Sequence, residues 1–153
     1  MTISKEEFSK FASNEYSLLD DQWRIIKRGF IVFAITSIFY LPIIGTIISV
    51  ISLINIHRKY KLVKSLKEQF QYKQISELYR SNFDYFRNGF CIYALIDLRD
   101  KNVIYEIATL LENPKIKEHK PTREALKKAQ KVLAVKFNYD SVDDMMRRER
   151  MAI

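Results

Sequence analysis

Few side chains in this sequence have the type and spacing that metal binding or nucleophilic catalysis requires. The chain holds two histidines, His57 and His119, and one cysteine, Cys91. No cysteine or carboxylate stands at ligand spacing from either histidine. Cys91 lies inside the apolar segment FCIYALI, where a buried and inert thiol is expected. The sequence therefore predicts no metal site and no catalytic cysteine.

The paired carboxylates fit structural roles better than acid–base catalysis. Each pair lies at the expected N-terminus of a helix, where the helix dipole stabilises negative charge. The pairs are Glu6–Glu7, Asp20–Asp21 and Asp143–Asp144. Three glycines cannot build a phosphate-binding loop or a dinucleotide fingerprint, and no G-x-S-x-G motif occurs. We therefore expect a protein that is not an enzyme, with no catalytic residues, no cofactor and no small-molecule substrate.

The strongest signal in the chain is a run of 28 residues, from Gly29 to Ile56, without a charged side chain. As one helix this run would be about 42 Å long, against roughly 30 Å for the hydrocarbon core of a bilayer. We expect a single transmembrane helix over 29–57, with Pro42 as the site of a possible kink. Two alternatives remain open. A hairpin that turns at Pro42–Gly45 would have arms of about 18 Å and enter one leaflet only, and a soluble core helix would be buried by a partner.

Aromatic and basic residues flank the uncharged run on both sides, as they do at membrane interfaces. The residues expected to contact lipid head groups or to fix the topology are Trp23, Lys27, Arg28, Arg58, Lys59, Lys61 and Lys64. The excess of basic residues on the C-terminal side places the C-terminal body on the positive-inside face, in the cytoplasm or an organelle matrix. We expect an integral protein of the inner membrane of a bacterium or mitochondrion, with membrane lipid as one partner.

Small residues share one helical face inside the run. Gly45, Ser49 and Ser52 follow the spacing i, i+4 and i+7, which allows helix backbones to approach closely in lipid. This face is expected to pack on a helix of another membrane-protein subunit.

The rest of the chain predicts an all-α protein. Three glycines and three prolines leave little turn chemistry for a sandwich or barrel. We expect a short amphipathic helical region over 1–28, a helical body over 58–113 with an aromatic-rich face, and a helical extension over 114–153. A β-hairpin over 90–111 is the alternative, but the apolar residues there recur at helical intervals.

The aromatic content of the body indicates a protein interface. Tyr and Phe beside basic residues are typical of such surfaces, and the expected interface residues are Phe83, Tyr85, Phe86 and Tyr93. The net charge of +8 is spread among interspersed acids, and no nucleic-acid motif occurs, so we expect no nucleic acid partner. The function that fits is a non-catalytic, membrane-anchored accessory or structural subunit of a larger membrane complex. The alternative is a small membrane regulator that acts alone, such as an immunity or anti-defence protein.

Overall fold

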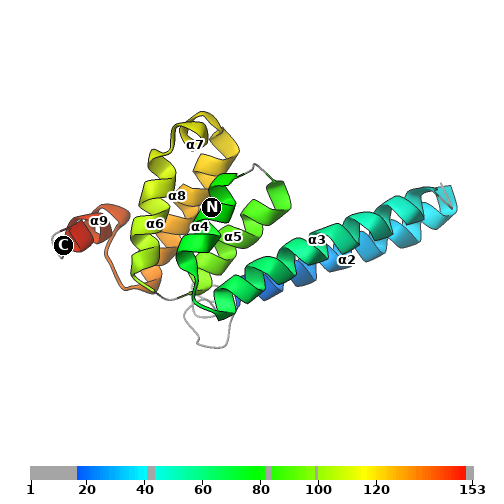
Figure 1. Ribbon diagram of the computed structural model, residues 1–153, viewed down its shortest axis with the longest axis horizontal. Coiled ribbons are helices and arrows are strands. Elements are labelled where there is room, and N and C mark those ends of the chain that lie inside the picture. The colour runs from blue at the N-terminus through cyan, green and yellow to red at the C-terminus, as the bar shows by residue number, and fades with distance from the viewer. Residues whose placement is uncertain (1–16, 41–43, 82–83, 99, 151–153) are drawn as a thin grey trace.

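The computed structural model describes residues 17–40, 44–81, 84–98 and 100–150, and all regular structure in these ranges is helical. Figure 1 shows two long helices that form a hairpin and a compact group of shorter helices at one end of it. The helices are α2 (Leu18–Tyr40), α3 (Ile44–Glu68), α4 (Tyr72–Ser81), α5 (Tyr85–Asp97), α6 (Asn102–Glu112), α7 (Pro114–Glu118), α8 (Lys120–Lys136) and α9 (Val142–Arg150). The predicted all-α class is confirmed.

The uncharged run forms two antiparallel helices, so the prediction of one continuous helix over 29–57 is wrong. Helix α2 ends at Tyr40 and α3 begins at Ile44, and the two helices lie side by side. Proline lacks a backbone N–H and disfavours helical backbone at the residue before it, so Pro42 is a natural place for the run to break. Among the described helices, none is both long enough and continuously apolar enough to cross a bilayer.

Helix α5, whose sequence is apolar on nearly every side, packs between the hairpin and helices α4 and α8. Helix α5 contacts α2, α3, α4 and α8, while α6 packs on α4 and α8. Its side chains Phe90, Cys91, Ala94 and Leu95 are fully buried. A helix that is apolar all round needs cover on all sides, and the surrounding helices supply it. The β-hairpin alternative over 90–111 is wrong, because α5 and α6 occupy that segment.

Two local features interrupt the helices of the body. Helix α3 ends at Glu68, and Phe70 adopts a left-handed backbone with φ of 55° before α4 begins. The polar segment after Asn113 also contains a short helix, α7, with Pro114 in its first turn and the Asn113 side chain accepting a hydrogen bond from the Lys115 N–H. Proline at this position costs no helical hydrogen bond. Of the short amphipathic helical region expected over 1–28, residues 1–16 lie outside the described residues.

The start of α2 is fixed to the end of α5 by a carboxylate. Asp97 accepts hydrogen bonds from the Leu18 N–H at 2.9 Å, the Leu19 N–H at 3.1 Å and the Ser17 hydroxyl at 2.8 Å. Lys67, near the end of α3, donates to the Ser17 hydroxyl at 2.9 Å. The first N–H groups of a helix have no partner within the helix, so this contact satisfies them and holds both arms of the hairpin to the body.

Candidate membrane-interaction site

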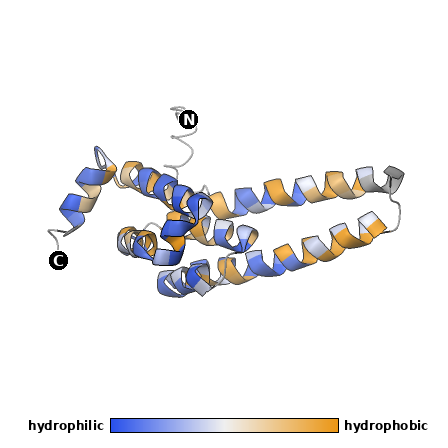
Figure 2. Cartoon of the chain, turned by 90° about the horizontal axis from the view of Figure 1, so that it is seen from above, coloured by the Kyte–Doolittle hydropathy of each residue, from blue (hydrophilic) through white to orange (hydrophobic). Residues whose placement is uncertain are grey.

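The half of the hairpin farthest from the body exposes large apolar side chains. We call this part the outer hairpin: residues 29–36 of α2 and 44–54 of α3. Ten of its large apolar side chains are 43–66% exposed: Ile31, Val32, Phe33, Ile35, Ile44, Ile47, Ile48, Val50, Ile51 and Ile54. Figure 2 shows hydrophobic residues along both arms toward the closed end, where no other labelled helix of Figure 1 lies beside them. Such a surface on a water-soluble protein marks a contact with another molecule or with a membrane.

The exposed apolar residues surround the outer hairpin instead of forming one stripe. Ile31, Val32 and Phe33 are consecutive, and neighbouring side chains of a helix are about 100° apart, so these three residues cover about 200° of the circumference of α2. On α3, the exposed apolar side chains between Ile44 and Ile54 cover about 160° of the circumference. A helix that docks on one protein needs one apolar stripe, whereas a helix in hydrocarbon is apolar on all sides.

Two hydroxyl groups in the outer hairpin, those of Thr36 and Ser49, are bonded to the backbone of their own helix. The Thr36 hydroxyl lies 3.1 Å from the Val32 carbonyl oxygen and 3.0 Å from that of Phe33. The Ser49 hydroxyl donates to the Gly45 carbonyl at 2.7 Å. Internal bonds of this kind satisfy polar groups without water, as a lipid environment requires.

The predicted small-residue face lies between the two arms of the hairpin. Ser49 is 3% exposed and Gly45 and Ser52 are half-buried, and α2 is the neighbouring helix along this part of α3. The small side chains therefore permit close approach of α2 within the same chain. Packing of this face on a helix of another subunit stays a prediction.

Aromatic rings fix the register of the two arms where the hairpin meets the body. Trp23 stacks on His57, with ring centroids 4.9 Å apart, and on Tyr60, at 5.0 Å. Phe90 of α5 lies edge-on to both Trp23 and Tyr60, at 6.4 and 5.8 Å. Trp23 is thus half-buried in this stack, on the side of the outer hairpin that is nearest the body.

Part of the predicted head-group set is engaged in ion pairs within the protein. Lys59 pairs with Asp84, the N-cap residue of α5, and Lys64 pairs with Asp20 at 3.0 Å. Burial opposes ionisation of both carboxylates, but hydrogen bonds outweigh it and lower their pKa: from Tyr60 and Lys64 to Asp20, and from the Arg87 N–H and Lys59 to Asp84. The hydrogen bond from Lys64 to Asp20 raises the pKa of Lys64. These lysines stabilise the base of the hairpin.

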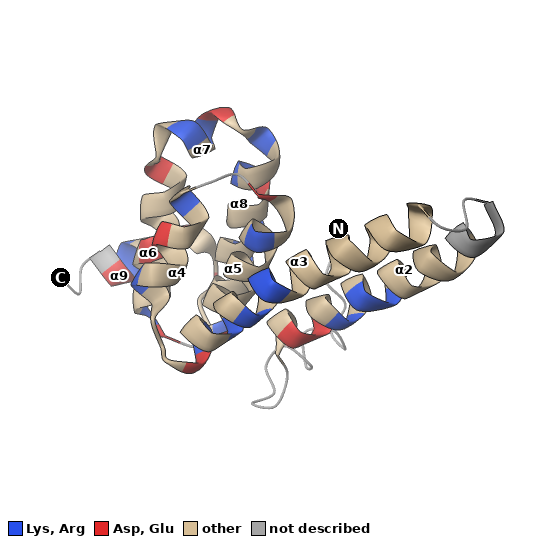
Figure 3. Ribbon diagram, turned by 45° about the vertical axis from the view of Figure 1, so that its right-hand side comes forward, with Lys and Arg blue, Asp and Glu red and all other residues tan. Residues whose placement is uncertain are grey.

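Four other members of the set are exposed and form no ion pair with a carboxylate of the described chain. We call Lys27, Arg28, Arg58 and Lys61 the basic collar. The sequence has no Asp or Glu between Asp21 and Glu68, so the hairpin beyond its base carries positive charge only. Figure 3 shows blue segments on both arms near the body and none farther out along the described arms.

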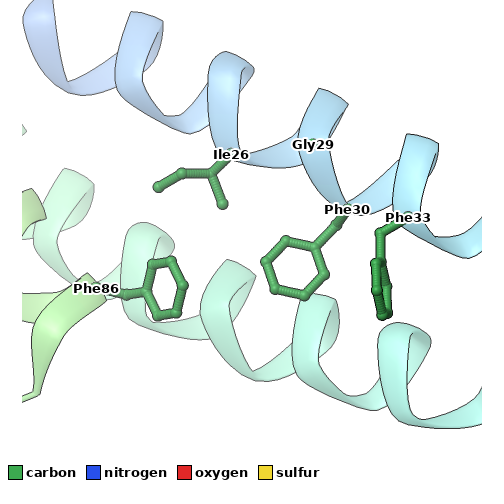
Figure 4. A pocket seen from close by; sticks show the side chains of 5 residues that line it. All are labelled: Ile26, Gly29, Phe30, Phe33 and Phe86. Atoms are coloured by element: carbon green, nitrogen blue, oxygen red, sulfur yellow. The ribbon is translucent and has the colours of Figure 1, made fainter. Parts of the chain in front are cut away.

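An apolar groove runs along α2, from the level of the basic collar toward the closed end of the hairpin. It has a volume of about 440 Å³ and is lined by Ile26, Gly29, Phe30 and Phe33 of α2 and by Phe86 of α5. Figure 4 shows the α2 side chains and the Phe86 ring pointing toward the same space, with Phe86 at the body end. The Phe30 and Phe86 rings are 6.3 Å apart. Sequence reasoning missed this groove, because it joins residues of two helices that are far apart in the chain.

The predicted partner-interface residues are exposed to different degrees, and the Tyr85 and Phe86 rings meet edge-on with centroids 5.4 Å apart. Tyr85 is 88% exposed, while Phe86 and Tyr93 are half-buried against the core. Phe83 lies outside the described residues. Phe70, 70% exposed in the turn after α3, is an exposed aromatic that the predicted set did not contain.

The structure bears on two of the residue types considered for catalysis, potential metal ligands and the cysteine. The described residues contain no cluster of three or more His, Cys, Asp or Glu side chains that could hold a metal ion. Burial raises the pKa of the Cys91 thiol to about 12, so the thiol is protonated at neutral pH and is a poor nucleophile.

No protein-family model matches the chain, and no curated protein or solved structure has a significant match to it. The hairpin is therefore the feature of the molecule that bears most directly on its function.

Proposed function

We propose that the protein is a non-catalytic, membrane-anchored accessory subunit whose α2–α3 hairpin inserts into one leaflet of a bilayer. The observation that supports this proposal most directly is the outer hairpin, whose two arms both expose large apolar side chains and which is bounded by the basic collar. Hydrocarbon contacts a helix from every side, and anionic head groups lie where the collar would be placed. Such an anchor enters and leaves the membrane on the same face, whereas a transmembrane helix would cross it.

The length of the uncharged part fits one leaflet. The stretch from Gly29 to the end of α2 at Tyr40 has 12 residues, or about 18 Å of helix. One half of a bilayer's hydrocarbon core is about 15 Å thick. The outer hairpin can therefore reach the middle of the bilayer while its collar stays among the head groups.

A hairpin anchor explains why basic residues stand on both sides of the uncharged run. Both flanks lie on one face of the membrane, together with the helical body, and the membrane attracts each exposed Lys or Arg by about 1 kcal/mol where its surface is anionic. The cytoplasmic or matrix face of a bacterial or mitochondrial inner membrane is the location that this charge favours.

The role as a subunit of a membrane complex is supported by exposed aromatic side chains on the body. Tyr85 is 88% exposed and Phe70 is 70% exposed, and aromatic residues are enriched in protein interfaces. Extraction of native membranes with mild detergent, followed by sizing of the tagged protein, tests this role. A large species of fixed composition is expected, and a small free species would favour a regulator that acts alone.

Vesicle flotation tests the anchor. The protein is expected to float with vesicles of phosphatidylglycerol and phosphatidylcholine, and Ile48→Asp should weaken binding by about 100-fold, because a carboxylate near the tip would enter hydrocarbon. Gln74→Asp, an exposed position on α4, makes the same charge change on the body and should bind like wild type. Equal binding of the two variants, or no flotation of the wild type, would refute leaflet insertion.

A further inference from the structure

We propose that the groove between α2 and Phe86 seats an acyl chain of a phospholipid from the same leaflet. This inference rests on the proposed insertion of the hairpin, and it adds a defined lipid site to a surface that otherwise meets lipid without specificity. The occupant is an acyl chain because the groove continues directly into the exposed apolar surface of the outer hairpin, through Phe33.

The groove has the size and lining of a site for an apolar ligand. Its volume of about 440 Å³ lies within the range of small-molecule sites, and carbon atoms of Ile26, Phe30, Phe33 and Phe86 form its walls. Gly29 leaves part of the space open, since a Cβ atom at this position would meet nothing within 4 Å. The glycine is therefore not required for packing of the two arms, and a larger side chain there would occupy the groove.

The direction of the groove matches that of a lipid chain beside the hairpin. From Ile26 to Phe33 the groove follows α2 for about 10 Å, which corresponds to the upper part of one acyl chain. Lys27 and Arg28 of the basic collar directly follow Ile26, which lines the end of the groove nearest the body, and lie in the same turn of α2. A chain that runs from Phe86 toward Phe33 would thus place its head group at the level of these cations.

Trp23, the only tryptophan of the chain, provides a built-in probe. It precedes Ile26 and Phe30 on the same face of α2, at positions i, i+3 and i+7. Detergent-solubilised protein is titrated with phosphatidylglycerol that is brominated near the head-group end of its chains, because bromine quenches tryptophan fluorescence at short range. For the wild type we expect quenching that saturates at a low ratio of lipid to protein.

Two substitutions at Gly29 separate the groove from the rest of the hairpin. Gly29→Leu fills the groove and should weaken saturation by about tenfold, since about two methylene groups of contact are lost. Gly29→Ala is the matched control, because it makes the same change from glycine but leaves most of the groove open. Phe33→Ala removes an exposed wall without adding bulk and should also weaken saturation.

Vesicle flotation of the same variants distinguishes this site from the anchor itself. Gly29→Leu is expected to float like wild type, since the outer hairpin stays apolar. Quenching of the wild type that never saturates, or equal saturation of Gly29→Leu and Gly29→Ala, would overturn the acyl-chain site while leaving the anchor intact. Loss of flotation of the wild type would instead refute the anchor.

Discussion

The outer hairpin and the helical body use similar apolar residues in opposite arrangements. In the body, Leu95, Ile104 and Leu133 are fully buried. In the outer hairpin, Ile47, Ile48 and their neighbours are about half-exposed although they lie in equally regular helices. Both parts belong to one chain, and α3 runs from one into the other. They differ in how far their apolar side chains are covered by the rest of the protein. The body carries its own apolar interior, whereas the outer hairpin leaves its large apolar side chains exposed.

The basic residues at the base of the hairpin and those of the basic collar also differ in whether they are paired. Lys59, Lys64 and Lys67 at the base each lie within ion-pair distance of an aspartate. The basic collar has no such carboxylate among the described residues, although it lies only a few residues away. Charges at the base therefore hold the protein together, and the proposed anionic membrane surface is the partner that we expect for the charges of the collar.

The largest expected effect contrasts the same kind of truncation in the two parts. Leu95→Ala should lower the free energy of unfolding by about 2–5 kcal/mol, because it opens a cavity in a closed core. Ile48→Ala should change it by less than about 0.5 kcal/mol, since its side chain is exposed, yet it should weaken vesicle binding by roughly tenfold. Urea unfolding followed by Trp23 fluorescence and vesicle flotation measure the two quantities. A large loss of stability in Ile48→Ala would mean that the outer hairpin is packed against protein.

Removal of charge from the collar should affect membrane binding but not the fold. Arg58→Gln together with Lys61→Gln should weaken binding to anionic vesicles by about 2 kcal/mol and leave binding to neutral vesicles unchanged. Lys127→Gln together with Lys128→Gln, at exposed positions of α8, removes the same charge from the body. If both pairs weaken binding equally, net charge and not the collar determines the attraction.

The attachment of the hairpin to the body depends on a carboxylate at the end of α5. Asp97→Ala should lower the free energy of unfolding by about 1–2 kcal/mol, because the Leu18 and Leu19 N–H groups lose their acceptor. Hydrogen exchange should become faster at these amides first. Asp143→Ala, at an exposed position in the first turn of α9, is the control and should have little effect. Unchanged exchange in Asp97→Ala would show that Ser17 alone caps α2.

The all-α class could be predicted from sequence periodicity, and the uncharged run is visible in the sequence itself. The sequence did not show that this run folds back on itself as two helices. A proline in a long apolar run is compatible with a kink or with a turn, and Pro42 gives the same local signal in both cases. What distinguishes them is tertiary: Trp23 stacks on Tyr60, and Ser49 is buried between the arms. Such contacts are absent from any local window of sequence.

The candidate site was predicted in part for the same reason. The basic residues were found because clusters of Lys and Arg beside an apolar run are visible in sequence. Their division into paired and unpaired sets was not, because Lys59 meets Asp84 and Lys64 meets Asp20 only after folding, across 25 and 44 positions of the chain.

The smallest expected effect is the pH dependence of the ion pair at the base. The pKa of Asp20 is lowered in the folded protein, so its ionised form stabilises the fold; this contribution is complete above about pH 5 and is lost as the pH falls through the lowered pKa, below about 4. The carboxylate is one-third exposed, and for such a pair we expect at most about 1 kcal/mol. Urea unfolding across this pH range compares the wild type with Asp20→Asn, which should be less stable at neutral pH and approach the wild type in acid. Because the collar forms no ion pair with a carboxylate of the described residues, vesicle binding should not follow the same transition. If it does, the base and the outer hairpin are coupled and cannot be treated as independent parts.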